Sequence, residues 1–170
     1  MPLEVGAAVM CFERGFYSTL LEKFYLDDAE KAPSIAGGLE GRVSDEVLVY
    51  RCCFGAPAAG LHLESLIASG VDRVIVAGEA GSISPDLELG DIYLPLWGVR
   101  EEGTSYHYLP PDAVCEPSNL LLNSVRDYLD DKNPKMGGVW TIDAGLRETE
   151  DKIKEYSVEG VHAVEMGAPR

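Results

Sequence analysis

The chain has 170 residues, of which 46% are hydrophobic and 25% charged, as expected for one soluble globular domain with a sizeable core. Acidic residues outnumber basic ones 29 to 14, and the resulting net charge of −15, with no basic stripe, argues against nucleic-acid and anionic-membrane partners. No apolar run approaches the roughly 18–20 residues that span a bilayer, and the N-terminus lacks the basic segment of a signal peptide. We therefore expect a cytoplasmic protein that forms a single domain over residues 1–170.

The first part of the chain predicts a strand, an ion-binding turn and a helix. Residues 5–10 form an apolar run suited to a buried strand, and apolar residues recur at helical spacing over 16–24. The loop between them carries Glu13 and Arg14. A guanidinium beside the positive end of a helix suits an anion, although a solvent-exposed Glu-Arg pair explains the two residues equally well.

The next segments predict a parallel strand–helix–strand unit. Residues 29–44 contain Pro33 and several glycines, which indicate a loop or hairpin, and residues 47–53 resume as a strand. A helix follows, with Ala59 and Ile67 on its buried face and His62 at its surface, and it stops at Gly70. The strand over 71–77 then predicts a right-handed crossover.

The second half predicts three further strands and two helices. The strand over 86–96 contains Pro95, which indicates an edge position or a bulge. A helix over 117–130, a short strand around Trp140, a helix over 147–157 and an apolar strand over 161–166 follow. This alternation is typical of an α/β fold.

The four cysteines do not indicate a metal site. Cys11, Cys52, Cys53 and Cys115 show no zinc-ligand spacing beside histidines, so we expect no metal. The adjacent Cys52 and Cys53 lie in an apolar run, where thiols usually pack as small hydrophobes.

The segment 71–111 is the predicted centre of the ligand site. Its strand runs directly into Gly78-Glu-Ala-Gly81, and glycines at the end of a buried strand permit a tight turn and a close backbone approach to a ligand.

Four segments of the chain resemble the purine nucleoside and uridine phosphorylase family. They are Phe54-Gly-Ala-Pro-Ala-Ala, Ala77-Gly-Glu-Ala-Gly-Ser-Ile-Ser-Pro-Asp-Leu-Glu-Leu-Gly-Asp, Val99-Arg-Glu-Glu-Gly-Thr-Ser-Tyr-His-Tyr-Leu-Pro-Pro and Glu159-Gly-Val-His-Ala-Val-Glu-Met. The third looks most like the uridine phosphorylase branch. The resemblance implies an α/β/α sandwich with a mixed, partly barrel-like central sheet, shortened at its C-terminal end, and assembly as homo-dimers or trimers of dimers.

The resemblance also implies an activity. Family members are transferases in which phosphate attacks the anomeric carbon of a nucleoside and releases the base through an oxocarbenium-like transition state. We expect a (pyrimidine) nucleoside as substrate, inorganic phosphate as co-substrate, no further cofactor, and a role in base salvage.

Site residues follow from the resemblance position by position, and no catalytic residue is assigned. The expected phosphate-binding residues are Arg14, Gly78 and Gly81; the ribose-binding residues are Glu165 and Met166; the base-binding residues are Trp140 and Arg147; further pocket walls are Glu79, Tyr106 and His107.

The sequence departs from the family at three positions. Where phosphorylases carry an Arg and a Ser or Thr around the glycine loop, this chain has Val76 and Ala80, which cannot donate to a phosphate. The second Glu of the ribose-binding motif is Gly167. Arg14, Arg100 or an arginine of another subunit would have to compensate.

Three hypotheses therefore remain open. The first is a nucleoside phosphorylase. The second is a phosphate-independent nucleoside hydrolase in which Glu13 or Glu79, its pKa raised by burial, activates water. The third is a catalytically degenerate family member that binds a nucleoside or serves in assembly.

Overall fold

The computed structural model describes residues 5–32 and 40–166. The chain divides into two compact units, Met1–Glu79 and Ala80–Arg170, and each is described here by itself. Pro33 and Gly167, on which part of the interpretation above depends, lie outside the described residues.

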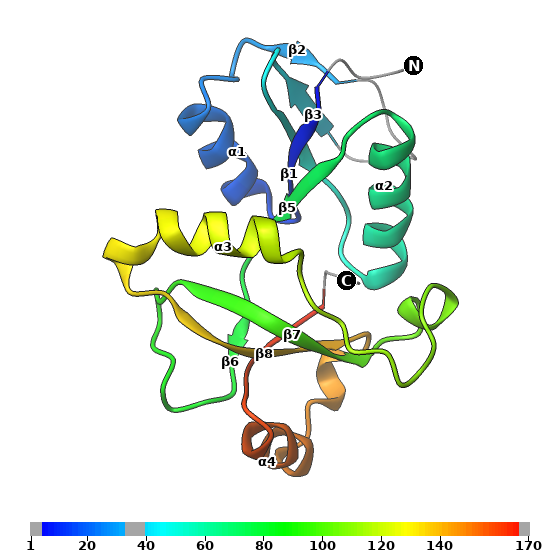
Figure 1. Ribbon diagram of the computed structural model, residues 1–170, viewed down its shortest axis with the longest axis vertical. Helices are drawn as coiled ribbons and strands as arrows, with labels where there is room; N and C mark the ends of the chain where they lie inside the picture. Colours follow the sequence, from blue (N-terminus) through cyan, green and yellow to red (C-terminus); the bar gives the residue numbers. More distant parts are fainter. Residues whose placement is uncertain (1–4, 33–39, 167–170) are drawn as a thin grey trace. The chain divides into compact units, whose positions relative to one another are not determined.

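The first unit is built on a mixed sheet with the strand order β2-β3-β4-β1-β5 (Figure 1). Its centre is parallel: β1 (Ala7–Cys11) lies between β4 (Leu48–Arg51) and β5 (Arg73–Val76). The short strands β2 (Glu30–Lys31) and β3 (Glu40–Val43) add an antiparallel edge. The antiparallel pairing of β2 with β3 agrees with the hairpin alternative for this region. The strands β4 and β5 run parallel as predicted, but they do not pair with each other, because β1 lies between them.

Two helices cover opposite faces of this sheet because successive strand residues point to opposite sides. On one face, Leu48 and Tyr50 pack with residues of α2 (Ala56–Ala68). On the other, Val49 packs with Tyr17 and Leu21 of α1 (Arg14–Lys23). The helix α2 ends just before Gly70, whose φ of +101° explains why a glycine stops it.

The prediction that His62 lies at the surface is wrong. Its side chain is 3% exposed, and Nδ1 lies 3.0 Å from the hydroxyl of Tyr50. The buried stripe of α2 runs through Ala59, His62 and Leu66, while Ile67, expected in the core, is 58% exposed. A polar residue occupies the core here because a strand residue supplies its hydrogen-bonding partner.

The second unit contains a four-stranded sheet with the order β6-β9-β8-β7. The strands β7 (Tyr93–Glu101), β8 (Lys135–Ile142) and β9 (Val161–Glu165) are parallel, and β6 (Gly81–Ser82) pairs antiparallel with β9. The pairing of β7 shifts between Pro95 and Trp97 at the edge of the sheet, which confirms the predicted bulge. The strand itself begins later and ends later than predicted.

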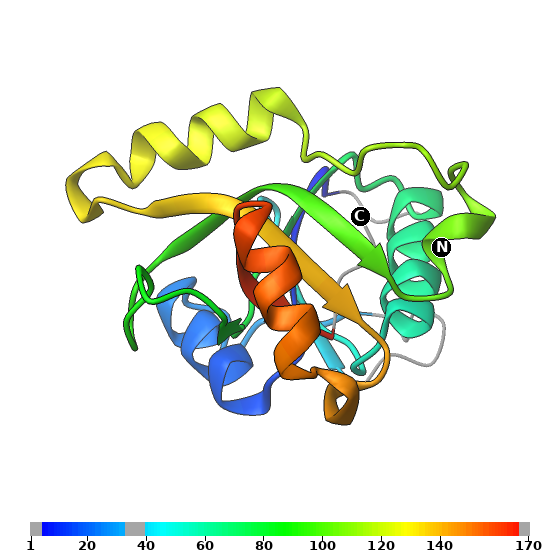
Figure 2. The ribbon, with the colours of Figure 1, turned by 90° about the horizontal axis from the view of Figure 1, so that it is seen from below.

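The helix α4 (Glu150–Val158) packs on one face of this sheet (Figure 2), where Ile153 and Tyr156 contact the core residues Trp140 and Ile142. The helix α3 (Asn119–Tyr128) lies on the opposite side in Figure 1 and has a half-buried apolar stripe. Short 3-10 turns occupy Ser105–His107 (η1), Asp130–Lys132 (η2) and Gly145–Arg147 (η3).

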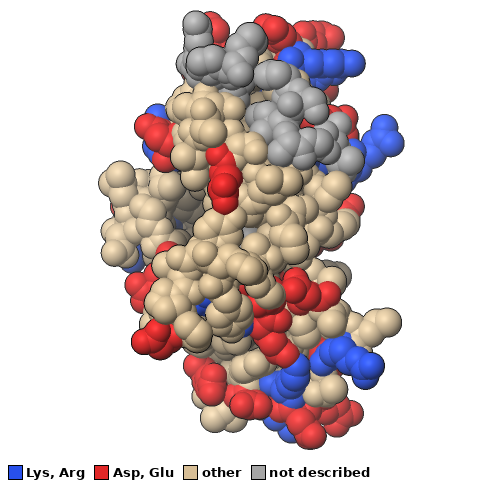
Figure 3. Space-filling view, turned by 90° about the vertical axis from the view of Figure 1, so that its right-hand side faces the viewer, with Lys and Arg blue, Asp and Glu red and all other residues tan. Residues whose placement is uncertain are grey.

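The α/β class is thus confirmed, and over the described residues neither sheet closes into a barrel. Among the helices of residues 5–32 and 40–166, none combines the length and hydropathy that crossing a bilayer requires. On the face drawn in Figure 3, Lys and Arg side chains lie scattered among Asp and Glu rather than gathered in a stripe.

Candidate functional site

The carboxyl ends of β7, β8 and β9 meet at one edge of the second sheet, the place where parallel sheets commonly bind ligands. The pairing register puts Arg100, Thr141 and Glu165 side by side in one row across the three strands. Trp140, the neighbour of Thr141, lies in the core under α4. Because strand residues alternate, the row of Arg100, Thr141 and Glu165 faces away from α4.

Glu165 is held at this edge by the neighbouring strand. The hydroxyl of Thr141 donates to Oε1 of Glu165 at 2.5 Å, and Thr141 is 6% exposed. A carboxylate with a charge-assisted hydrogen bond from a buried donor has a restricted side-chain orientation. The structure thus anchors the residue that the family resemblance assigns to ribose.

Met166 follows Glu165 and lies against the segment after β8. A Cβ at Gly145 would approach the Met166 sulfur to 3.0 Å, so the two chains are in close contact there. Arg147, two residues further on, ends η3 and is exposed. The fold therefore brings Glu165, Met166 and the segment with Arg147 to one edge of the sheet.

Trp140 lies elsewhere. Its side chain is fully buried, its ring is 4.8 Å from that of Tyr156, and Nε1 has no hydrogen-bonding partner among the described residues. It belongs to the α4 side of the sheet, opposite Thr141 and Glu165. Its assignment to the base stays a prediction, and the packing observed is that of a core residue.

Arg100 organises the loop that follows β7. Its guanidinium donates to Oγ of Ser105 at 2.8 Å and to three backbone carbonyls, those of Leu109 (3.0 Å), Pro110 (2.8 Å) and Ala113 (3.2 Å). These bonds engage most of the donors of the guanidinium, so Arg100 holds its own loop, and its part as a substitute phosphate donor stays a prediction.

Tyr106 and Glu102 complete this loop. The Tyr106 hydroxyl donates to the Arg100 carbonyl at 2.6 Å, and the ring centroid lies 4.5 Å from the guanidinium carbon. The buried carboxylate of Glu102 accepts from the backbone N–H groups of Thr104 (2.6 Å) and Ser105 (2.9 Å) and from the Ser105 hydroxyl. Tyr106 thus has a scaffolding contact, whereas His107 beside it is exposed.

Asp143 ties the end of β8 to the same loop, because its Oδ2 accepts from the backbone N–H of Gly103 at 3.0 Å. Sequence reasoning did not single out Thr141, Asp143 or Glu102. The alternation of strand residues could have indicated the position of Thr141. Because Trp140 lies in the core, the neighbouring Thr141 has to face the other side of the sheet.

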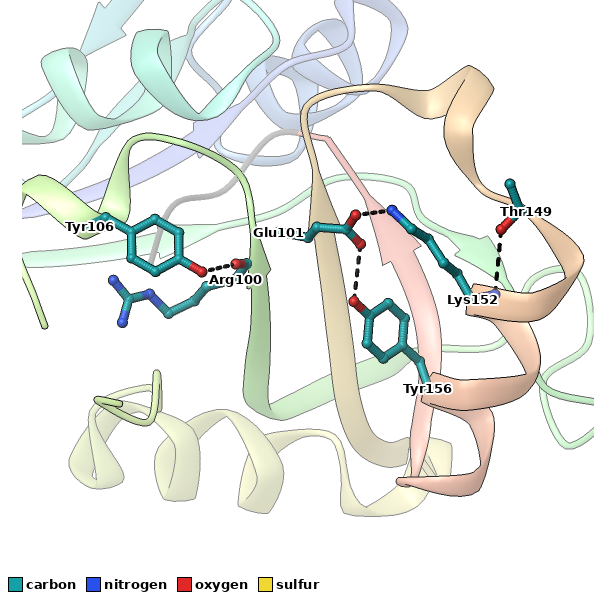
Figure 4. A network of polar contacts seen from close by, with 6 residues as sticks. All are labelled: Arg100, Glu101, Tyr106, Thr149, Lys152 and Tyr156. Atoms are coloured by element: carbon teal, nitrogen blue, oxygen red, sulfur yellow. Dashed lines mark hydrogen bonds and ion pairs between the residues drawn. The ribbon is translucent and has the colours of Figure 1, made fainter. Parts of the chain in front are cut away.

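A second network fixes α4 to β7 on the far face of the sheet (Figure 4). The Glu101 carboxylate pairs with the ammonium of Lys152 and accepts from the Tyr156 hydroxyl at 3.0 Å. Burial, and after it this hydrogen bond, raise the pKa of Tyr156 to about 12. Thr149 caps the helix by accepting from the Lys152 amide, and the ammonium of the same Lys152 side chain joins the helix to the strand β7 through Glu101.

The predicted phosphate residues of the first unit lie at the surface. Arg14 is the first residue of α1, exposed at the positive end of that helix. Gly78 is exposed, and a Cβ there would meet the Phe12 ring at an ordinary 3.5 Å. Glu13 and Glu79 are exposed, so the burial that the hydrolase hypothesis required for a general base is not seen at either carboxylate.

Gly81 belongs to the second unit, where it pairs with Val164 across β6 and β9. A Cβ at Gly81 would come within 3.2 Å of the Val164 side chain. This contact gives the glycine a packing reason that is independent of any ligand.

The cysteines behave mainly as hydrophobes. Cys11, Cys52 and Cys115 are buried and Cys53 is exposed. Burial raises the pKa of Cys11 to about 11 and that of Cys52 to about 12, which disfavours the thiolate, the reactive form of a cysteine. Among the described residues, His, Cys, Asp and Glu form no cluster that would hold a metal ion.

Comparison with known proteins gives a consistent result. Residues 9–168 match the family described as the phosphorylase superfamily. A guanosine phosphorylase of Halorubrum lacusprofundi is 26% identical over 116 residues, which are 67% of this chain and 48% of that protein. A uridine phosphorylase of Thermococcus kodakarensis is 40% identical over 55 residues, 32% of this chain and 20% of that protein. The chain thus spans half or less of the length of these relatives.

Solved structures show the same fold. Uridine phosphorylase from Vibrio fischeri superposes with a TM-score of 0.82 at 22% identity, covering 95% of this chain and 68% of that one. A futalosine hydrolase mutant of Helicobacter pylori superposes with a TM-score of 0.78 at 21% identity, covering 98% of this chain and 80% of that one. At these identities the likeness defines the architecture, which is the nucleoside-phosphorylase type of α/β fold.

Proposed function

The chain belongs to the phosphorylase superfamily, and from this membership we propose that it binds a nucleoside and cleaves its N-glycosidic bond with phosphate as the acceptor. The observation that carries the proposal is the position of Glu165, a carboxylate hydrogen-bonded to Thr141 at the carboxyl ends of parallel strands. A carboxylate there suits the hydroxyl groups of a ribose, because it accepts the hydrogen bonds that they donate.

The proposed reaction joins a phosphate oxygen to C1′ of the sugar as the bond from C1′ to the base nitrogen breaks. The departing base takes the electron pair of that bond and is protonated. Glu165 would grip the sugar hydroxyls, and Met166 would pack against its apolar side. Arg14 at the start of α1 supports phosphate binding, since an exposed guanidinium and a helix N-terminus both attract anions.

A hydrolase is the second candidate, favoured by a specific observation in the glycine loop. Val76 and Ala80 replace the anion donors of phosphorylases, and a reaction with water needs no cationic cradle. The structural likeness to a futalosine hydrolase points the same way.

Further parts of the proposal come from the family resemblance. They are a preference for a pyrimidine base, a role in salvage, a cytoplasmic location, and assembly into dimers or trimers of dimers.

The deciding experiment measures base release from uridine, inosine and guanosine with and without inorganic phosphate. Release that requires phosphate and yields ribose 1-phosphate supports the phosphorylase. Release at the same rate without phosphate replaces it with the hydrolase. Nucleoside binding without release identifies a degenerate binding protein, and no binding at all refutes the proposal.

Arg14→Ala tests the phosphate residue. We expect the KM for phosphate to rise by roughly tenfold or more, the worth of one charged hydrogen bond, with little change in the KM for nucleoside. Arg126→Ala is the matched control, because Arg126 is an exposed helix arginine of the second unit. An unchanged phosphate KM in Arg14→Ala would remove Arg14 from the site.

A further inference from the structure

We propose that Thr141 is a positioning residue: its hydroxyl sets the orientation in which the Glu165 carboxylate meets the hydroxyl groups of a ribosyl ligand. The inference rests on the proposed function, because it assigns to Glu165 a ligand of that class. The family resemblance assigns no role of its own to Thr141.

The packing of β8 makes a buried hydroxyl at position 141 unfavourable unless the hydroxyl has a hydrogen-bonding role. Trp140 and Ile142, on either side of Thr141, fill the core under α4, and Thr141 faces the other way while remaining 6% exposed. A valine has nearly the same shape and an equal preference for strands, and it would avoid burying a polar group. The cost of burying the Thr141 hydroxyl is offset by the hydrogen bond that it donates to a charged acceptor, Oε1 of Glu165, at 2.5 Å.

The pairing of β8 with β9 makes this contact a fixed feature of the sheet. Thr141 and Glu165 are register partners on neighbouring parallel strands, so the donor and the acceptor start from adjacent backbone positions. Thr141 has a short, β-branched side chain with restricted rotamers, whereas Glu165 has three rotatable bonds. The stiff residue therefore orients the flexible one.

The chemistry follows from the acceptor capacity of a carboxylate. Its two oxygens offer about four lone-pair sites, so a bond from Thr141 to Oε1 is compatible with further bonds donated by a ligand. Without the threonine, the Glu165 side chain has to be ordered when the ligand arrives, and that ordering weakens binding. The effect should be confined to ligands that carry hydroxyl groups at C2′ and C3′ of the sugar.

The test compares Thr141→Val, which removes the hydroxyl and keeps the shape, with Thr141→Ser, which keeps the hydroxyl. The first measurement needs no nucleoside: crystal structures of the ligand-free variants show where the Glu165 carboxylate lies. We expect it to leave its wild-type position in Thr141→Val and to keep it in Thr141→Ser. Thr141→Ala provides the same comparison should the valine variant fail to fold.

The second measurement is calorimetric binding of uridine and of 2′,3′-dideoxyuridine. Thr141→Val should bind uridine up to roughly tenfold more weakly, because the Glu165 side chain then has to be ordered on binding, and Thr141→Ser should restore the affinity. Affinity for 2′,3′-dideoxyuridine should not change, whereas a general loss of structure would weaken the binding of both compounds. Thr19→Val, at an exposed hydroxyl of α1, serves as the control.

A carboxylate that stays in place in both Thr141→Val and Thr141→Ala overturns the inference, as does equal loss of affinity for the two ligands. Failure of the proposed function looks different. In that case the wild-type protein binds no riboside, while the position of Glu165 in the variant structures still decides whether Thr141 orients it.

Discussion

The hydroxyl of Tyr50 and Nδ1 of His62 lie 3.0 Å apart inside the first unit, where the two side chains are 1% and 3% exposed. One residue comes from a central strand and the other from α2, so this hydrogen bond joins the sheet to the helix that covers it. The tilted rings are 5.4 Å apart, which adds packing to the polar contact.

Tyr50→Phe should therefore destabilise the protein although it removes a single oxygen atom. His62 loses a buried partner, and the expected decrease in the free energy of unfolding is about 1–3 kcal/mol. Urea unfolding followed by circular dichroism measures it. Tyr128→Phe, at a tyrosine that is 84% exposed, is the control and should match the wild type. Equal stability of Tyr50→Phe and wild type would show that the bond contributes nothing.

The buried thiol of Cys52 should make stability fall at alkaline pH. Burial raises its pKa from 9.0 to about 12, so above pH 9.0 the unfolded chain loses a proton that the folded chain keeps. This contribution is complete below pH 9.0 and is lost as the pH rises towards the folded value, at no more than about 1.4 kcal/mol per pH unit. Cys11 and Tyr50, whose pKa values are also raised by burial, add to the same slope.

Urea unfolding between about pH 8 and about pH 11 tests this dependence. Cys52→Ala should flatten the alkaline slope, while Cys53→Ala, at the exposed neighbouring cysteine, should change it far less, because burial is the largest cause of the raised pKa of Cys52. The same slope in both variants would refute the assignment to Cys52.

Arg100→Lys should loosen the loop after β7, although it conserves the charge. A lysine cannot reproduce the fork that reaches Ser105 and the carbonyls of Leu109 and Pro110 together. We expect about 2–3 kcal/mol less stability and faster hydrogen exchange of the Leu109 amide, which donates to the Ser105 carbonyl at 2.9 Å. The matched control is Arg126→Lys, at an exposed helix position. Unaltered hydrogen exchange of the Leu109 amide in Arg100→Lys would contradict the role of Arg100 in holding this loop.

Gly138→Ala should cost stability for a steric reason. A Cβ at Gly138 would lie 2.5 Å from the Trp97 ring, which cannot move freely because it packs against the core of the second unit. Overpacking of this kind costs typically about 1–3 kcal/mol. The opposite result is expected for Gly15→Ala in α1, where nothing lies within 4 Å of the new atom and helix propensity favours alanine by about 0.5–1 kcal/mol. Thermal unfolding of the two variants measures both signs.

Local patterns in the sequence predicted the elements and the family. Periodicity located the strands and helices, Gly70 marked the end of α2 and Pro95 marked the bulge, since each depends on the conformations that one residue type allows. The four segments that resemble the family identified the fold because each is a contiguous stretch, which can be recognised in the sequence without the structure. The predicted ligand residues Glu165 and Met166 came from the same source.

The tertiary structure decided which side chains meet. His62 is buried because Tyr50, on the strand before the helix, shares a hydrogen bond with it that offsets the cost of burying a polar group. A helical pattern in the sequence does not reveal such a partner. Arg100 is committed to its loop through carbonyl groups, which every residue carries and no sequence motif reveals. Thr141 and Glu165 stand together because the register of two parallel strands pairs them across 24 residues of chain, and a register is a property of the folded sheet.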